Sequence, residues 1–376
     1  MKFQVNRDAF NEAVSFVVRV LPQRIPMPIL NGILIEADAN ALRLSVFDYE
    51  VSAQVEIVAK VEKAGRVLVS GRLLSEITAK LPNAPIELSL EGNKVLLTCG
   101  ASKFNLLTMP VEEYPNLPEL PATSITISGE DFAKAVHQIV PAVAKNDHVM
   151  TLNGMLFEVL EKSVSLLGTD RHRMAVKEVP WSGTSDLVGY VSVVPTRTLT
   201  EVAKTFGHQG ELTLAINNDE NRGLIAFKAN NRTITSLLIK GRYPDVKEHL
   251  PSEEIPEFAI VNTQDLIDST RRVSLVLDKQ PALKYSFDDS QVVLEASESA
   301  QASESVSTEM NGKEIVVMLK PQFLIDGLTA CHSEFVKIAF TNNENPHKPG
   351  PVLISSHGAK DKTDSYQYLL QPNLLR

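Results

Sequence analysis

The hydrophobic positions of the chain follow two periodicities that succeed one another three times. In "FQVNRDAFNEAVSFVVRVLP" (3–22), a short strand-like run passes into apolar residues spaced three and four apart. The wider spacing is typical of an amphipathic helix. The same succession returns at 125–144 and at 258–277. An acidic residue suited to a first helical turn stands near the start of each expected helix: Asp8, Asp131 and Asp265.

Each third of the chain continues with the same series of expected elements. A hairpin-like pair of strands follows the first helix, then a strand that runs into a second helix, then two more strands. Val69, Val194 and Leu319 occupy equivalent places in the strand before the second helix. We therefore expect a unit close to β-α-β-β-β-α-β-β, present three times.

The repeated pattern indicates the fold class and the domain organisation. Strands with alternating apolar residues and short turns favour antiparallel sheets backed by helices, an α+β class. Proline-rich, acidic joins at 115–124 and 250–258 are typical of linkers between domains. The sequence predicts three tandem copies of one domain, at 1–120, 121–252 and 253–376.

The composition of the 376 residues, 43% hydrophobic and 22% charged, is ordinary for a globular protein. No apolar run approaches the roughly 20 residues that span a bilayer. Arg7 and Asp8 stand where a signal peptide would need its apolar core. We therefore expect a cytoplasmic protein without a membrane partner. Two cysteines, Cys99 and Cys331, cannot make a zinc site and are expected to be small buried hydrophobes.

The charges leave the question of nucleic acid open. A formal net charge of −9 argues against a protein that coats nucleic acid with its whole surface, but not against a local basic surface. The expected helices carry Lys and Arg residues that acidic residues interrupt. Two interpretations remain: an array of helices that contacts duplex phosphates without sequence preference, or ordinary solvated helix faces.

One stretch has the residues of an active site. "LLGTDRHRMAVKEV" (166–179) places Asp170, Arg171, His172 and Arg173 in succession, which could serve acid–base chemistry, phosphate binding or a peptide pocket. The sequence has no Gly-rich phosphate loop, HExxH, nucleophile elbow or CxxC pair, and its histidines lack the spacing of metal ligands. We expect no catalysis, metal or cofactor; an enzyme that uses Asp170 and His172 is the rival hypothesis.

Six stretches carry a family resemblance: the start "MKF", "MPILNGILIE", "LNGMLFE" (152–158), "TDRHRMAV" (169–176), "GRYPDV" (241–246) and "YLLQP" (368–372). Through them the whole chain resembles the β subunit of bacterial DNA polymerase III, the sliding clamp. In that family two three-domain protomers join head to tail into a ring, and duplex DNA passes through the hole. The resemblance implies a homodimer of clamp-type domains, with antiparallel sheets outside and two helices per domain lining the ring, that makes the replicative polymerase processive.

The resemblance also implies two sets of functional residues. Arg24, Arg72 and Arg197 match places where clamps carry basic residues near DNA, whereas Gln322 occupies that place in the third repeat. DNA polymerase, the clamp loader and repair proteins would dock short linear motifs in a pocket between the second and third domains. The residues implied for the pocket are Leu152, Thr169, His172, Arg173, Met174, Pro244, Leu369, Leu370, Gln371, Pro372 and Asn373.

The closing "YLLQPNLLR" departs from the family pattern. Clamps of this kind usually have apolar residues where Gln371 and Asn373 stand. Both side chains could point to solvent and matter little. Alternatively, the pocket is altered, and the chain is a specialised second clamp copy that resists a clamp-directed inhibitor. An interaction scaffold that never encloses DNA is a further alternative.

Overall fold

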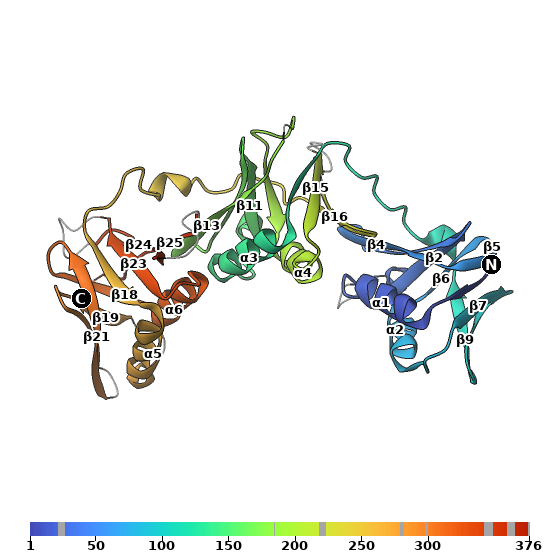
Figure 1. Ribbon diagram of the computed structural model, residues 1–376, viewed down its shortest axis with the longest axis horizontal. Helices are drawn as coiled ribbons and strands as arrows, with labels where there is room; N and C mark the ends of the chain where they lie inside the picture. The colour runs from blue at the N-terminus through green and yellow to red at the C-terminus, as the bar shows by residue number, and fades with distance from the viewer. Residues whose placement is uncertain are drawn as a thin grey trace. The chain divides into compact units, whose positions relative to one another are not determined.

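The computed structural model of the protein describes residues 1–21, 27–183, 185–217, 223–278, 282–297, 300–341, 349–358 and 365–374. Three successive segments contain similar series of elements (Figure 1). The first, blue to cyan in Figure 1, contains β1 (Lys2–Val5), α1 (Arg7–Val18), β2 (Gly32–Asp38), β3 (Ala41–Phe47), β4 (Val51–Val58), β5 (Lys60–Lys63), β6 (Gly65–Ser70), α2 (Gly71–Lys80), β7 (Ile86–Glu91), β8 (Lys94–Cys99) and β9 (Ser102–Met109).

The other two segments follow the same order. The central one contains β10 (Ser124–Ser128), α3 (Gly129–Ile139), β11 (Gly154–Val159), β12 (Ser163–Thr169), β13 (Arg173–Pro180), β14 (Val191–Pro195), α4 (Thr196–Phe206), β15 (Glu211–Asn217), β16 (Leu224–Ala229) and β17 (Arg232–Leu237). The last contains β18 (Phe258–Asn262), α5 (Thr263–Val273), β19 (Leu283–Phe287), β20 (Gln291–Ser297), β21 (Gln301–Asn311), β22 (Ile315–Leu319), α6 (Pro321–Ala330), β23 (Phe335–Phe340), β24 (Val352–His357) and β25 (Gln367–Leu370).

The α+β class and the triplication are confirmed, but each repeat has more strands than the sequence predicts. The hairpin-like pair is in fact three strands, and a further strand such as β7 directly follows the second helix. One cause is a tight turn between β3 and β4. Asp48 Oδ1 accepts hydrogen bonds from the backbone N–H groups of Glu50 (3.0 Å) and Val51 (2.7 Å). Such a turn takes too few residues to interrupt the apolar alternation.

Contacts divide the chain into two compact units, and the central repeat contributes to both. The domain boundaries expected from the sequence therefore stay a prediction. The units are Met1–Glu130 with Trp181–Leu187 and Arg197–Leu238, and Asp131–Pro180 with Val188–Thr196 and Ile239–Arg376.

The first unit contains a sheet in the order β10-β15-β16-β17-β4-β3-β2-β6-β9-β8-β7-β1-β5. β17 pairs antiparallel with β4, so strands of the first and central repeats share one sheet. The hydroxyls of Ser52 and Thr235 lie 2.6 Å apart across this pair. Helix α1 packs against α2 and begins at a side-chain cap, because Asn6 Oδ1 accepts from the N–H groups of Asp8 (2.9 Å) and Ala9 (3.1 Å).

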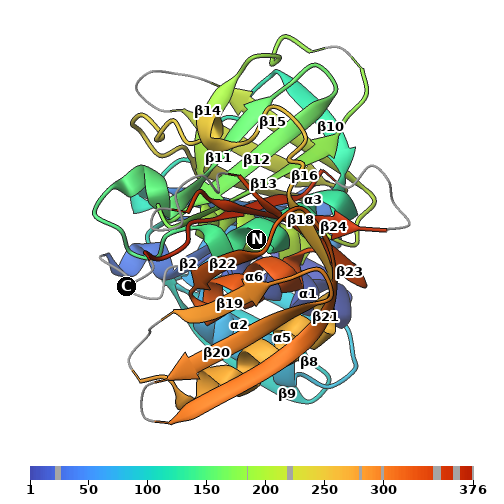
Figure 2. The same ribbon diagram turned by 90° about the vertical axis from the view of Figure 1, so that its left-hand side faces the viewer.

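The second unit contains a sheet in the order β14-β11-β12-β13-β25-β24-β23-β18-β21-β20-β19-β22. β13 pairs with β25 and places Met174 opposite Leu369. Helix α5 packs on α6 and against β20 and β21 (Figure 2). The buried Gln138 of α3 donates to the carbonyl of Ala330 at the end of α6 (2.6 Å), so α6 is also joined to the central repeat.

Two expectations from composition concern the cysteines and membrane segments. Cys99 and Cys331 are both buried, as the sequence predicts. Within the part of the chain that the structure describes, no helix has the length and apolar character needed to cross a membrane.

Helix α6 approaches β25 closely at Gly327. A Cβ atom there would lie 2.5 Å from Cδ1 of Tyr368. Alanine favours a helix interior over glycine by about 1 kcal/mol, but overpacking costs about 1–3 kcal/mol. We expect Gly327→Ala to lower the free energy of unfolding by about 1 kcal/mol, measured by urea denaturation. Thr329→Ala, on the exposed side of α6, is the matched control; a Gly327→Ala protein as stable as this control would contradict the close approach.

Candidate functional site

The charged stretch of the sequence forms the turn between β12 and β13, residues 169–173. Asp170 Oδ1 accepts hydrogen bonds from the N–H groups of His172 (3.0 Å) and Arg173 (3.1 Å). The Thr169 hydroxyl donates to the Arg173 carbonyl (2.7 Å) and accepts from the N–H of Arg171 (3.1 Å). Asp48 makes the equivalent two hydrogen bonds in the first repeat. The Asp170 carboxylate therefore serves the turn, which is a structural role and needs no catalysis.

Arg171 lies at the tip of this turn with a backbone φ of +73°. This left-handed conformation is unfavourable for a residue with a Cβ atom. The guanidinium of Arg171 makes two 2.8 Å hydrogen bonds to the two oxygens of Asp147. These bonds, with a further one from the N–H of Val149, lower the pKa of the Asp147 carboxyl. The ion pair thus links the tip of the turn, where Arg171 has its unfavourable backbone conformation, to Asp147 in the segment before β11.

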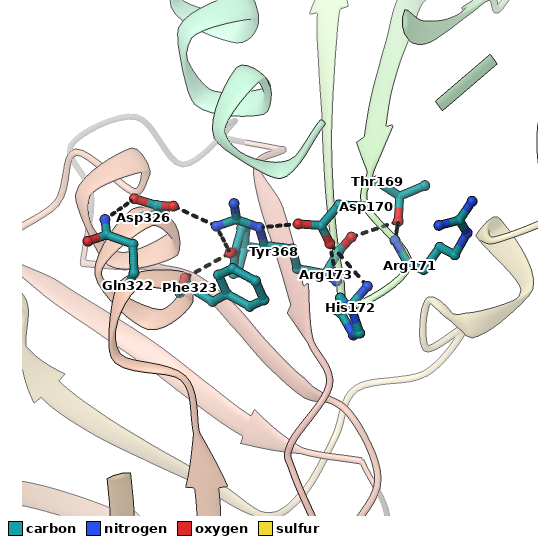
Figure 3. A network of polar contacts seen from close by, with 9 residues as sticks. All are labelled: Thr169, Asp170, Arg171, His172, Arg173, Gln322, Phe323, Asp326 and Tyr368. Carbon is teal, nitrogen blue, oxygen red and sulfur yellow. Dashed lines mark hydrogen bonds and ion pairs between the residues drawn. The ribbon is translucent and has the colours of Figure 1, made fainter. Parts of the chain in front are cut away.

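Arg173 points away from the tip and toward the last repeat (Figure 3). Its Nε donates to Asp170 Oδ2 (2.9 Å), and its Nη1 donates to Asp326 Oδ2 (2.5 Å) and to the Tyr368 hydroxyl (3.2 Å). The guanidinium carbon lies 4.1 Å from the centroid of the Phe323 ring. Burial lowers the pKa of Arg173, but the contacts with Tyr368, Asp326 and Asp170 raise it by more. The pKa therefore lies above the ordinary arginine value, and the side chain stays charged.

His172 remains exposed beside this network. Its ring centroid lies 6.3 Å from that of Phe323, and its carbonyl accepts a hydrogen bond from the N–H of Gln371 (2.9 Å). Of the polar residues that the sequence implies for the pocket, His172 and Gln371 are the two that are exposed.

An apolar cluster lies next to the turn. Leu152, Met174 and Leu369, all implied by the resemblance, meet in it, whereas Leu370 is buried outside it because alternate residues of a strand face opposite sides of the sheet. The sequence did not indicate the other members, and burial raises the pKa of one of them, Tyr243. The apolar cluster consists of Leu152, Leu167, Met174, Val176, Val193, Tyr243 and Leu369.

A small hollow of about 90 Å³ opens beside the cluster. Ligand pockets usually measure about 300–1,000 Å³, so the hollow takes part of a side chain and a larger ligand must move its rim. The rim carries three exposed basic side chains, Arg171, His172 and His249, and the exposed amide Gln371. The full lining is Thr169, Arg171, His172, Arg173, Met174, Val246, His249, Pro351, Leu369 and Gln371.

Five residues implied for the pocket do not line this hollow: Leu152 and Leu370, whose places are given above, and Pro244, Pro372 and Asn373. Pro244 is exposed, and its buried neighbour Tyr243 joins the apolar cluster instead. Pro372 is buried. The N–H of Asn373 donates to the carbonyl of Met318 (2.8 Å), which fixes the chain after β25 beside β22. Val246, Arg171, His249 and Pro351 were not among the residues implied for the pocket, although "GRYPDV" ends in Val246 and "TDRHRMAV" contains Arg171.

The residues expected to face DNA lie at the starts of second helices. Arg72 and Arg197 are exposed in the first turns of α2 and α4. Gln322 occupies the same place in α6 and donates to Asp326 Oδ1 (2.7 Å). Arg24 lies outside the described residues. Among the residues that the structure describes, no group of three or more His, Cys, Asp or Glu side chains is placed to hold a metal ion.

Comparison with known families covers almost the whole chain. Residues 1–118 match the N-terminal domain of the DNA polymerase III beta subunit, 126–245 its central domain and 247–363 its C-terminal domain. The chain belongs to this family. The order and extent of the three matches agree with the three repeats of the structure.

Individual members of the family are similar over their full length. The beta sliding clamp of Streptomyces coelicolor is 39% identical to this chain, with 99% of each covered. A beta sliding clamp homolog, GriR, of Streptomyces muensis is 32% identical, again with 99% of each covered. The crystal structure of a Pseudomonas aeruginosa sliding clamp bound to griselimycin shares the fold, with a TM-score of 0.90, 24% identity and 100% of both chains covered.

The ion pair between Arg171 and Asp147 makes stability depend on pH. The folded state lowers the pKa of Asp147, so the unfolded state takes up a proton first as the pH falls. The stabilisation is complete above the ordinary carboxyl pKa of 3.8 and is lost as the pH drops below it. We expect Asp147→Asn to lower the melting temperature at neutral pH and the difference from wild type to shrink as the pH falls below 3.8.

The matched control is Asp289→Asn, which removes an exposed aspartate in the turn after β19. Melting temperatures of the three proteins would be measured by scanning calorimetry. A difference between Asp147→Asn and wild type that does not change with pH would contradict the ion pair as its cause.

Proposed function

We propose that the protein is a DNA sliding clamp that encircles duplex DNA and thereby makes the replicative DNA polymerase processive. The observation that carries this proposal is the match of all three repeats, in order, to the three domains of one clamp family. The relationship to the S. coelicolor clamp extends over the same length. DNA would be bound without sequence preference, through phosphates rather than bases.

The helices supply the positive charge that this function needs on an acidic protein. Arg72 and Arg197 are exposed at the starts of α2 and α4, and positive side chains at a surface attract phosphates. We propose that they face the DNA. With a net charge of −9, the rest of the surface repels DNA, which favours sliding over tight attachment.

Encirclement requires a closed ring, which we propose is a homodimer. Exposed apolar side chains are common on protein surfaces, but an interface between protomers also needs apolar side chains that the monomer leaves exposed. Leu107 on β9 is 69% exposed, and Leu275, in the short 3-10 helix after α5, is 82% exposed. We expect both to be covered when the ring closes.

The partners would dock in the second unit, at the apolar cluster and the hollow beside it. A short linear motif fits there because an apolar anchor can enter between Met174, Val246 and Leu369. The exposed rings of His172 and His249 at the rim can donate hydrogen bonds to a peptide that carries acidic residues or a terminal carboxylate. DNA polymerase, the clamp loader and repair proteins are the partners that we propose for this pocket.

The same geometry argues for binding rather than catalysis. Asp170 is held by two backbone N–H groups and by Arg173, so the Asp170–His172 enzyme has no free carboxylate to serve as its base. A protein without catalytic activity, located in the cytoplasm, stays our prediction.

One observation favours the second candidate, a specialised clamp copy with an altered pocket. Gln371 is exposed and lines the hollow, so a polar amide stands at the rim where the family usually carries an apolar residue. The 39% identity to the S. coelicolor beta sliding clamp, over 99% of each chain, favours the ordinary clamp and makes the specialised copy the weaker proposal.

Peptide binding is tested by calorimetric titration with a synthetic C-terminal peptide of the host's replicative polymerase. We expect one site per protomer. Val246→Asp should weaken binding at least about tenfold, because it places a charge in the apolar hollow. Val58→Asp makes the same change at a valine that is 84% exposed in the first unit and should bind like wild type.

Two outcomes of this titration separate the candidates. Wild-type protein that does not bind, or a Val246→Asp protein that binds normally, would remove the pocket from the proposal. A Gln371→Met variant that binds the peptide or griselimycin sharply better than wild type would favour the specialised copy over the ordinary clamp.

The ring is tested by retention on DNA after loading by the host's clamp loader. We expect the protein to stay on nicked circular DNA and to dissociate once the DNA is linearised. Leu275→Asp should lower the dimer fraction in native mass spectrometry and shorten retention, because it buries a charge at the contact between protomers. Leu120→Asp, the same change at a leucine that is 48% exposed outside any helix or strand, is the control. Equal retention on linear and circular DNA would indicate the scaffold that never encloses DNA.

A further inference from the structure

A continuous series of polar contacts leads from the turn 169–173 into helix α6 (Figure 3). Arg173 donates to one oxygen of Asp326 (2.5 Å), and the other oxygen of Asp326 accepts from Gln322 (2.7 Å). Tyr368 joins from β25, because its hydroxyl accepts from Arg173 (3.2 Å) and donates to the Phe323 carbonyl (2.8 Å). The turn that borders the hollow is thus connected to an exposed side chain, Gln322, in the first turn of α6.

The contacts of Arg173 are all made within the protein. Its side chain is only 9% exposed, and its donors go to Asp170, Asp326 and Tyr368, while its flat face covers Phe323. Removing one partner of a buried charge leaves that charge uncompensated, which is costly. A peptide that recruited this guanidinium would have to break such a pair. Arg173 is therefore better suited to fix the turn than to bind the peptide.

The repeats explain why position 322 is neutral. In α2 and α4, Arg72 and Arg197 stand four residues before Glu76 and Glu201. In α6, Gln322 stands four residues before Asp326. Residues four apart are neighbours on a helix surface, so an arginine at 322 would compete with Arg173 for the same carboxylate. The amide keeps its hydrogen bond to Asp326 without offering a second positive charge.

We propose that helix α6 sets the affinity of the pocket for its peptide through Asp326, with Arg173 acting as a positioning residue that holds the turn 169–173 in its binding geometry. This inference rests on the proposed peptide-binding function of the hollow. Thr169, His172 and Met174 all belong to the turn or follow it directly, so loosening Arg173 disorders the rim before binding. A site that is competent for only part of the time binds its ligand correspondingly more weakly.

The test is a double-mutant cycle on the full-length protein, with the synthetic polymerase peptide as the probe. We expect Asp326→Asn and Arg173→Lys each to weaken binding about fivefold, and the double variant to be little weaker than either alone, because both changes break one connection. Melting temperatures are recorded for every variant. A merely structural role would lower the melting temperature without this non-additive change in peptide affinity.

A surface variant covers the case in which the buried variants fail to fold. Gln322→Arg changes an exposed side chain, so the fold should persist, and competition for Asp326 should weaken peptide binding about twofold. Gln322→Ala, which removes the amide without adding charge, is its control.

Each outcome has a distinct meaning. Arg173→Lys weakened with Asp326→Asn unchanged would mean that Arg173 contacts the peptide itself and would overturn the inference. Unchanged affinity in a folded Gln322→Arg protein would do the same. If these variants bind normally while Val246→Asp does not, the proposed function survives and only the coupling to α6 fails; if Val246→Asp also binds normally, the proposed pocket itself is wrong.

Discussion

The antiparallel pairing of β13 with β25 is the constraint on which the candidate site depends. It places Met174 opposite Leu369 and Arg173 opposite Leu370, although about half the chain separates them. Backbone hydrogen bonds fix this register, and a shift by one residue would turn every side chain of β25 to the other face. Leu369 would then leave the apolar cluster, and Tyr368 would no longer meet Arg173.

The turn 169–173 shows how one repeated element acquires a local function. In the first repeat the corresponding turn is closed by Asp48 alone, and Val51 follows it. In the central repeat Asp170 closes the turn in the same way, but Arg173 stands where Val51 does, and its charge finds partners on α6 and β25. The turn is thus inherited from the repeat, while the connection to α6 depends on one changed side chain.

The sequence predicted what local periodicity encodes. The class, the triplication and the helix starts follow from residues near one another, and Asn6 and Asn262 cap α1 and α5 near the expected acidic residues. The extra strands were missed because their turns are too short to break the alternation. The partner of Arg173 was invisible, because Asp326 lies 153 positions away and nothing local marks the pair.

For the candidate pocket, too, some residues could be predicted from the sequence and others could not. Leu152, Met174 and Leu369 came from the family resemblance, which encodes tertiary contacts that periodicity does not. Tyr243 was overlooked in favour of its neighbour Pro244, because burial within a loop depends on how that loop packs and not on its pattern.

The shared sheet of the second unit has a consequence for how the protein can be divided. A central repeat expressed without residues 365–374 would leave β13 at the edge of its sheet, because β12 would stay paired with it on one side while its other neighbour, β25, would be missing. Met174 and Val176, now buried, would then lie beside a row of open backbone donors and acceptors. Such an edge is a template for aggregation, so this repeat is not an independent module that can be cut out and moved to another chain.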